Sequence, residues 1–219
     1  TPLYSSAASD VYKRQMIKAA EQKGIRLFGI TEHAPKMPGT CSELYFNNLR
    51  VLERKHGEMY TLFGAELNIM DMEGHVDLPE RTLKQMDLCV ASMHGPCFHP
   101  GTIEENTKTY LNVMKNPYVN IIGHPDDSYY PVDYRALVEG AKEHHVLLEV
   151  NNGSLTPGGF RQNTKENSCK MLELCKEYKV PVIMDSDAHV DTAVGNHQYP
   201  LEVIQMAVSY THLTLPTNR

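Results

Sequence analysis

Short apolar segments rich in β-branched residues alternate with segments of helical spacing through most of the chain. The apolar segments are nearly continuous, which is typical of strands in a parallel sheet that is covered on both faces. Six segments are expected to form such strands: 26–33, 59–70, 88–95, 119–125, 146–152 and 180–189. Helical spacing between these segments predicts helices over 16–23, 43–55 and 103–115, with Ser42 and Thr102 as the caps of the last two. Strands that alternate with helices at this period predict βα units, so the sequence is expected to fold as an α/β domain.

Each of the six expected strands ends in polar side chains that can bind a metal ion or a phosphate group. These side chains are His33, Glu66, His94, His124, the pair Asn151 and Asn152, and the pair Asp187 and His189. In a parallel barrel the carboxyl ends of all strands lie on one face, and that face carries the chemistry. Four imidazoles and two carboxylates would then meet in one cleft, which favours a βα barrel over an open doubly wound sheet.

Neutral imidazole and carboxylate groups are the ligands of Zn²⁺, Fe²⁺ and Mn²⁺ in proteins. A single histidine at a strand end is more often a hydrogen-bonded surface residue than a ligand. Four histidines and two acids on one face, without a lysine or arginine nearby, indicate a metal site instead. Asp187 and His189 lie two residues apart, so on an extended backbone they point the same way and can share that site. Zn²⁺ is the expected cofactor, with Mn²⁺ or Fe²⁺ as alternatives.

The net charge argues against some classes of partner, and the cysteine content indicates the cellular compartment. A net charge of −6 argues against a nucleic-acid backbone or an anionic membrane surface as the main partner. No apolar run approaches the ~20 residues that a membrane span needs. The five cysteines are an odd number and form no Cys-x-x-Cys pair, so a disulfide scaffold is not expected and a cytoplasmic location is.

Five short motifs resemble those of the PHP family of metal-dependent phosphoesterases, which includes histidinol phosphatases and polymerase-associated domains. The motifs are Ile-Thr-Glu-His, Gly-Ala-Glu-Leu-Asn, Ser-Met-His, Gly-His-Pro and Ser-Asp-Ala-His, and they occur in the family's order within residues 16–206. The resemblance implies a distorted (β/α)7 barrel that resembles a TIM barrel, with a cluster of up to three metal ions. It also implies that the substrate is a small phosphorylated metabolite.

The resemblance assigns the metal ligands position by position. His33 and His189 would belong to one metal ion. Glu66, His94 and His124 would hold a second ion, which would leave a fourth coordination position open for water.

The resemblance also assigns a third ion, and the chemistry of phosphate binding suggests two further residues. Glu66 would bridge to a third ion, which Asp187 would help to hold, and Glu66, Asp187 and His189 are the expected catalytic residues. Arg161 and Asn152, both close to the end of the fifth strand, are the candidates for substrate binding. Arginine suits this role because its guanidinium can bind a phosphate through two hydrogen bonds.

One part of the family pattern is absent from the sequence. The family begins with a strand that ends in His-x-His, whereas no histidine precedes His33. The first strand is therefore expected to be missing, and residues 1–15 and 209–219 are expected to be non-native end segments of an incomplete domain at 16–208. Such a chain should bind fewer metal ions than a complete relative and should be weakly active or inactive.

The expected reaction is hydrolysis of a small phosphate monoester by a metal-bound hydroxide in a multinuclear cluster. No Ser, Cys or Asp nucleophile with an adjacent base is evident, and the sequence contains no phosphate-binding loop of the kinase type. Two alternatives stay open: a PHP-like domain that binds metal without catalysis, and a hydrolase of the amidohydrolase type. The second would usually need a metal-bridging lysine at a strand end, and none of the six ends has one.

Overall fold

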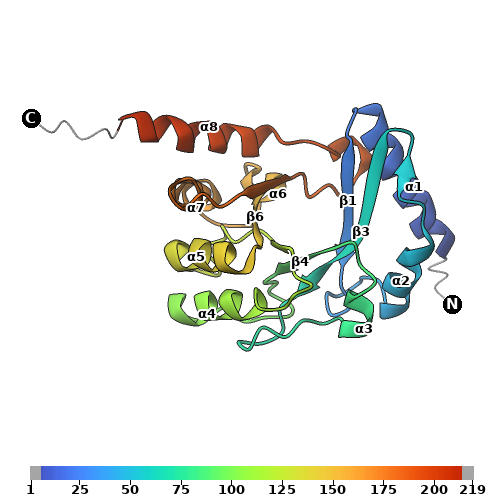
Figure 1. Cartoon of the computed structure of the whole chain (residues 1–219), viewed down its shortest axis with the longest axis horizontal. Helices are drawn as coiled ribbons and strands as arrows, with labels where there is room; N and C mark the ends of the chain where they lie inside the picture. Colours follow the sequence, from blue (N-terminus) through green and yellow to red (C-terminus); the bar gives the residue numbers. More distant parts are fainter. Residues whose placement is uncertain (1–5, 214–219) are drawn as a thin grey trace, which may run out of the picture.

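The computed structural model describes residues 6–213, which form a parallel sheet surrounded by helices (Figure 1). The strands are β1 (Leu27–His33), β2 (Lys55–His56), β3 (Met59–Asn68), β4 (Leu88–Ser92), β5 (Ile121–Ile122), β6 (Leu147–Asn151) and β7 (Val182–Asp185). The α-helices are α1 (Ser6–Gln22), α2 (Glu43–Asn48), α3 (Glu80–Leu83), α4 (Ile103–Val113), α5 (Tyr134–His144), α6 (Asn152–Leu155), α7 (Thr164–Tyr178) and α8 (Gln198–Leu213). Two short 3₁₀ helices are η1 (Leu49–Val51) and η2 (Asp191–Ala193).

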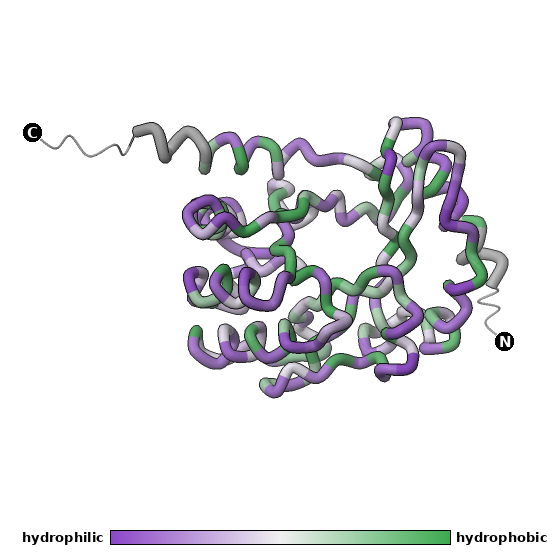
Figure 2. The backbone as a smooth tube through the Cα atoms, in the orientation of Figure 1, coloured by the Kyte–Doolittle hydropathy of each residue, from purple (hydrophilic) through white to green (hydrophobic). Residues whose placement is uncertain are grey.

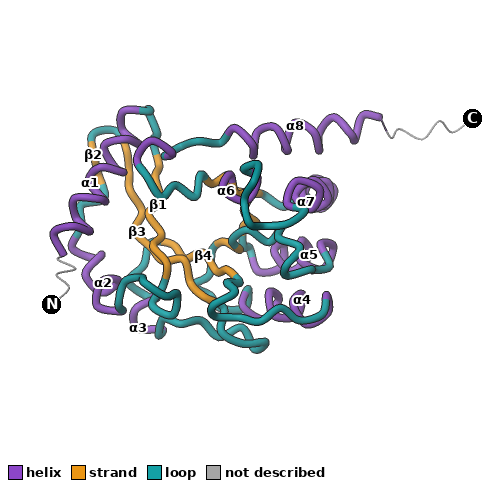
Figure 3. The backbone as a smooth tube through the Cα atoms, turned by 180° about the vertical axis from the view of Figure 1, so that it is seen from behind, coloured by secondary structure: helices purple, strands orange, loops and turns teal. Residues whose placement is uncertain are grey.

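The strands form one sheet in the order β1-β3-β4-β5-β6-β7, and all neighbours along this order pair in parallel. The short β2 pairs with the start of β3 in the antiparallel direction. Within residues 6–213, β1 and β7 are the two edges of the sheet. The sheet curls into a half-barrel (Figure 3), so the predicted α/β class and barrel-like architecture are confirmed.

Helices cover the outer face of the curled sheet. Helices α4, α5 and α7 lie side by side along it, and α8 packs against α7 (Figures 1 and 3). Helix α1 lies at the other end of the sheet, beside β1. Apolar residues concentrate along the strands, whereas the outlying helices and loops are mostly hydrophilic (Figure 2). Burial of this apolar surface between the sheet and its helices is the main stabilising contribution.

Two of the helix starts predicted from the sequence differ in how they are capped. Thr102 begins α4 with a complete capping box, because its hydroxyl accepts from the Glu105 backbone N–H and the Glu105 carboxylate accepts from the Thr102 N–H. Ser42 precedes α2 but its side chain caps no N–H group. The helix expected over 43–55 is correspondingly short: α2 ends at Asn48, and the chain continues as η1 and then as β2.

The expected non-native end segments lie partly within the described residues. Residues 6–15 form the first part of α1, so the helix expected from Met16 begins earlier, and residues 209–213 form the end of α8. Residues 1–5 and 214–219 lie outside the described residues. Among residues 6–213, no helix combines the length and the apolar character needed to span a membrane.

Candidate metal centre

Glu66, at the carboxyl end of β3, lies at the centre of the side chains that the sequence singled out as metal ligands. Its Oε1 lies 3.1 Å from His94 Nε2 and 3.2 Å from His124 Nε2, and its Oε2 lies 3.0 Å from His33 Nδ1. The Ser92 hydroxyl donates a further hydrogen bond of 2.9 Å to Oε1. The ends of four parallel strands therefore bring one carboxylate and three imidazoles to a single point.

The atoms around Glu66 Oε1 have the spacing of a zinc site. Glu66 Oε1, His94 Nε2 and His124 Nε2 form a triangle with edges of 3.1, 3.2 and 3.3 Å. Two nitrogen ligands at tetrahedral positions around Zn²⁺ lie about 3.3–3.4 Å apart, given Zn–N bonds of about 2.0–2.1 Å. The triangle thus has the dimensions of one face of a tetrahedral zinc site, and a carboxylate with two imidazoles fits a divalent cation.

His33 adds a third imidazole to the cluster, next to Oε2 of Glu66. Ligand atoms of His33, Glu66 and His94 all lie within 4.8 Å of one another. His33 Nδ1 is buried, and its 3.0 Å contact with Glu66 Oε2 falls outside strict hydrogen-bond geometry. A cation bound beside these two atoms would give the buried nitrogen a ligand contact.

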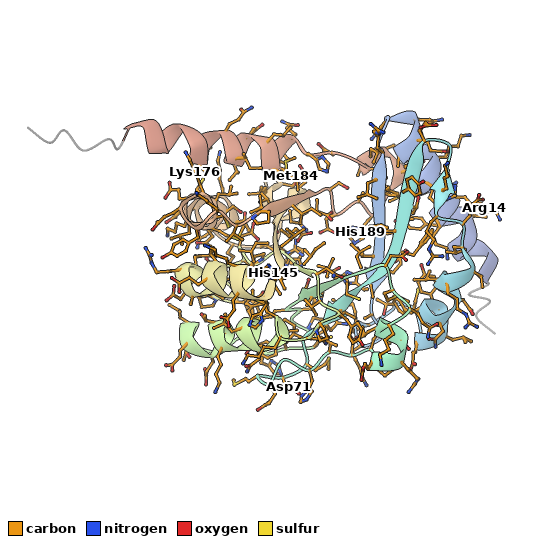
Figure 4. The ribbon with its side chains drawn as sticks, viewed as in Figure 1. Arg14, Asp71, His145, Lys176, Met184 and His189 are labelled. Atoms are coloured by element: carbon orange, nitrogen blue, oxygen red, sulfur yellow. The ribbon has the colours of Figure 1, made fainter. Side chains whose placement is uncertain are left out.

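Asp187 and His189, which follow β7, form a more open side of the same cavity, whose volume is about 140 Å³. The His189 ring lies 6.4 Å from the His33 ring, and His189 Nδ1 lies 3.7 Å from Asp187 Oδ1. His189 is 74% exposed, whereas His94 is 8% and His124 is 4% exposed. His189 is labelled in Figure 4, on the segment that runs from β7 toward β1.

Two of these side chains stand on backbone in the left-handed region. His124 has a φ of 30° and Asp187 has a φ of 47°. Residues other than glycine rarely adopt such angles, and a structure that holds them there stores strain. The His124 conformation is fixed by its own N–H, which donates a 2.6 Å hydrogen bond to Glu149 Oε2. The Asp187 N–H likewise donates to Asp185 Oδ1 over 2.6 Å.

The electrostatics of the site favour an ionised Glu66 carboxylate beside a neutral His124 imidazole, whereas the contact with Glu66 raises the pKa of His33. Burial alone would raise the pKa of Glu66, but its contacts with His124, His33 and His94 outweigh burial and hold the pKa well below its usual range. Burial and the nearby Arg161 charge lower the pKa of His124. Ionised carboxylate and neutral imidazole are the forms that bind metal.

Two acids beneath the site were not identified from the sequence. Burial, together with the neighbouring Asp185 and Glu66 charges, raises the pKa of Glu149 well above its usual range. Burial also raises the pKa of Asp185, with Asp187 contributing. Both acids bind backbone N–H groups of predicted ligands, as described above. The sequence did contain a signal for Glu149, since it is the only charged residue of β6 and lies between the apolar residues Leu148 and Val150.

Asn68 was also missed, although it lies two residues after Glu66 and therefore on the same side of β3. Its Oδ1 lies 2.7 Å from His94 Nδ1, and its amide nitrogen donates to Asp77 Oδ2 over 2.7 Å. The oxygen must therefore accept from a ring N–H, which places the lone pair of His94 on Nε2, toward Glu66. Asn68 thus sets the tautomer and the direction of His94.

We expect Asn68→Ala to weaken zinc binding by about 10–100-fold, because a ligand that loses its outer hydrogen-bond partner loses its fixed orientation. The measurement is a competitive titration with a chromophoric chelator. Asn112→Ala is the matched control, since the Asn112 amide binds the Met72 carbonyl at the surface. Equal zinc affinity for the Asn68 variant and the wild type would contradict the orienting role.

The two predicted substrate-binding residues lie in different environments. Arg161 reaches into the site: its Nη1 donates to Ser154 Oγ over 3.0 Å and lies 3.6 Å from Asp187 Oδ2, and its side chain is 10% exposed. Asn152 is buried at the start of α6, where its amide oxygen accepts from the Tyr199 backbone N–H over 3.3 Å. That contact links Asn152 to α8.

Comparison with curated proteins finds bacterial relatives over most of the chain. A probable phosphatase of Clostridium novyi is 43% identical over 187 residues, which cover 85% of this chain and 76% of the relative. A probable phosphatase of Caldicellulosiruptor saccharolyticus is 40% identical over 207 residues, which cover 94% of this chain and 85% of that protein. No family model matches the chain.

Two solved structures share the fold. A histidinol phosphate phosphatase of Lactococcus lactis, complexed with zinc, L-histidinol and phosphate, superposes with a TM-score of 0.57 at 17% identity, covering 89% of this chain and 86% of the other. A chain in archaeal ribonuclease P with mature tRNA gives a TM-score of 0.53 at 15% identity, covering 94% and 90% of the two chains. With relatives above 40% identity over most of its length and the fold of a histidinol phosphate phosphatase, the chain belongs to the PHP family of phosphatases.

Proposed function

We propose that this chain hydrolyses small phosphate monoesters with the help of divalent cations held at the strand ends. The triangle formed by Glu66 Oε1, His94 Nε2 and His124 Nε2 carries the proposal, because its edges of 3.1 to 3.3 Å match a zinc site. The relatives named as probable phosphatases and the zinc-containing histidinol phosphate phosphatase support the same reaction. We assign the function to one domain at residues 16–208.

We propose Zn²⁺ as the cation of this triangle, with Mn²⁺ and Fe²⁺ as competitors for the same ligand types. Up to two further ions would use the other predicted ligands, one between His33 and His189 and one between Glu66 and Asp187. Cations bound there would supply charge to offset the phosphoryl oxygens and would lower the pKa of a bound water to about 7.

The side chains of the chain itself would bind and orient the ester. Arg161 is the proposed phosphate ligand, since its guanidinium lies within the site beside Asp187 and carries several N–H donors. Asp187 and His189 border the cavity on its exposed side, where the leaving group would depart. Asn151 would help to orient Asp187, because its amide nitrogen donates a hydrogen bond to Asp187 Oδ2 over 3.3 Å.

The test is phosphate release from an aryl phosphate by the chain loaded with Zn²⁺ or Mn²⁺. We expect weak turnover in the wild type, because no His-x-His motif precedes His33, and its loss in His124→Ala, with an unchanged circular dichroism spectrum. His75→Ala is the matched control, because the His75 side chain is exposed and pairs with Asp71 at the surface. Turnover retained by the His124 variant would refute the proposed site.

The same experiment decides between the proposal and the alternative of a metal-binding domain without catalysis. Stoichiometric zinc binding that depends on His124, with no phosphate release from any ester tried, would favour that alternative. Hydrolysis of amide or ester substrates in place of phosphate esters would favour a hydrolase of the amidohydrolase type.

A further inference from the structure

Asp127, in the connection between β5 and α5, is a buried acid that the proposed function does not use. Its Oδ1 accepts hydrogen bonds from two backbone N–H groups, that of Tyr129 over 3.0 Å and that of Gln162 over 3.0 Å. Gln162 lies 35 positions further along the chain and directly follows Arg161. The Asp127 side chain therefore joins the loop after β5 to the residue beside the proposed phosphate ligand.

A second contact holds the other polar group of the Gln162 backbone. The Ser128 N–H donates to the Gln162 carbonyl oxygen over 3.0 Å. The Ser128 hydroxyl in turn accepts from the side-chain amides of Asn163 over 3.1 Å and of Asn167 over 2.9 Å. The N–H and the carbonyl group of Gln162 are thus bound to consecutive residues of the loop after β5, which restricts both the position and the orientation of Gln162.

The segment before Arg161 gives the arginine less support. Residues 156–160 are exposed. The backbone N–H groups of Thr156 and Gly159 donate to carbonyl groups of α6 and of the segment itself. An exposed segment with local hydrogen bonds belongs to the least stable parts of a fold. The direction in which the Arg161 side chain leaves the backbone therefore depends on the hydrogen bonds of Gln162.

This support matters because the charged end of Arg161 lies inside the site. The side chain is 10% exposed, and its Nη1 lies 3.0 Å from Ser154 Oγ and 3.6 Å from Asp187 Oδ2. A guanidinium binds a phosphate through a planar set of N–H donors, so its position must be correct at hydrogen-bonding distance. A side chain that is already held in place loses less conformational entropy when the ligand binds.

We propose that Asp127 is a positioning residue, which holds Gln162 so that Arg161 points into the phosphate site. The proposal rests on the proposed function, in which Arg161 binds the phosphoryl group. It adds a residue that acts on phosphate binding through a backbone hydrogen bond between two loops.

The test compares Asp127→Ala with Asp133→Ala. Asp133 is the matched control, because its Oδ1 also accepts from two backbone N–H groups, over 2.9 and 3.2 Å, but these belong to Arg135 and Ala136 at the start of α5. Each variant removes one carboxylate and two backbone hydrogen bonds, so both should lower the Tm.

Only Asp127→Ala should weaken the binding of inorganic phosphate to the zinc-loaded chain. We expect its phosphate Kd, measured by calorimetry, to rise about tenfold, which corresponds to one weakened hydrogen bond to a charged group. In turnover of an aryl phosphate, the KM of Asp127→Ala should rise while kcat changes little. An equal rise in the phosphate Kd of Asp133→Ala would overturn the proposal.

Two further variants separate positioning from a general structural effect. Asp127→Asn keeps an Oδ1 acceptor, so its phosphate Kd should stay close to the wild-type value. In an Arg161→Ala background, Asp127→Ala should add nothing to the phosphate Kd. The positioning role is wrong if asparagine fails to rescue phosphate binding, or if the effect of Asp127→Ala is undiminished without Arg161.

Asp127→Ser provides the decisive variant if Asp127→Ala does not fold. A serine hydroxyl can keep the local hydrogen bond to the Tyr129 N–H, two residues along the chain, but its shorter side chain does not reach Gln162. The loop after β5 should then keep its turn while the link to Gln162 is lost, and the phosphate Kd should rise. A wild-type Kd in Asp127→Ser would contradict the proposal.

Failure of the underlying function gives a different result. Unchanged phosphate binding in Arg161→Ala would remove Arg161 from the phosphate site and would reject both proposals. Weakened binding in Arg161→Ala, with wild-type binding in Asp127→Ala, would reject only the positioning role. A wild-type chain that binds zinc but no phosphate would also contradict both.

Discussion

Glu66→Gln is expected to abolish phosphatase activity and to weaken zinc binding by more than about 100-fold, since losing even an outer partner of a metal ligand costs about 10–100-fold. The Glu66 carboxylate contacts His33, His94 and His124 together. Glutamine keeps the shape of the side chain but removes the negative charge that would offset a bound cation. The measurements are the zinc content after gel filtration and kcat/KM for an aryl phosphate.

The matched control is Glu80→Gln, which makes the same chemical change on α3, where Glu80 pairs with Lys84 at the surface. Surface pairs of this type contribute little, so the control should retain both zinc and activity. Wild-type zinc binding in Glu66→Gln would show that the three imidazoles do not share a cation through this carboxylate.

Gly64→Ala is expected to unfold the chain or to lower its Tm by about 10 °C. A Cβ at Gly64 would lie 1.8 Å from the Leu88 carbonyl oxygen, which belongs to the backbone of the adjacent strand β4. Since the neighbouring atom is backbone, relief requires separating two central strands. We estimate the loss at roughly 3–5 kcal/mol, above the ordinary cost of overpacking, and at about 2–4 °C of Tm per kcal/mol for a chain of this size.

Gly29→Ala is the control within the same sheet. Its added Cβ would lie 3.7 Å from a Leu88 side-chain carbon, an ordinary van der Waals contact, so the Tm should change by only a few degrees. Thermal unfolding followed by circular dichroism compares the two variants. Equal stability of the two alanine variants would mean that β3 and β4 are less closely apposed than the structure describes.

The sequence predicted the strands and their ends better than the connections between them. Apolar β-branched runs are buried on both faces, so strand positions such as β4 and β6 could be recognised from composition alone. The polar residue near the end of each run then indicated the side of the sheet where the carboxyl ends of the strands lie. The prediction of a helix over 43–55 was wrong after η1, because the chain there forms β2, which pairs with β3.

The residues that support the site were harder to predict because each acts through a contact distant in sequence. Glu149 accepts a hydrogen bond from the His124 N–H across 25 positions, and Asn68 contacts His94 across 26. Glu149 and Asn68 did have a local signal, a polar side chain inside an apolar strand, whose meaning depends on which face of the sheet it occupies.

The order of the strands divides the site into two mechanically different halves. Glu66 lies in β3, and His94 and His124 follow β4 and β5; these three strands are joined by a continuous ladder of backbone hydrogen bonds, so the spacing of the three side chains is preorganised before any ion arrives. An ion between His33 and His189 would instead bridge the ends of β1 and β7, the two edges of the sheet, and among residues 6–213 no ladder joins those two strands. Binding an ion there requires the ends of β1 and β7 to approach each other. The site formed by Glu66, His94 and His124 should therefore be occupied at lower zinc concentrations than the site between His33 and His189.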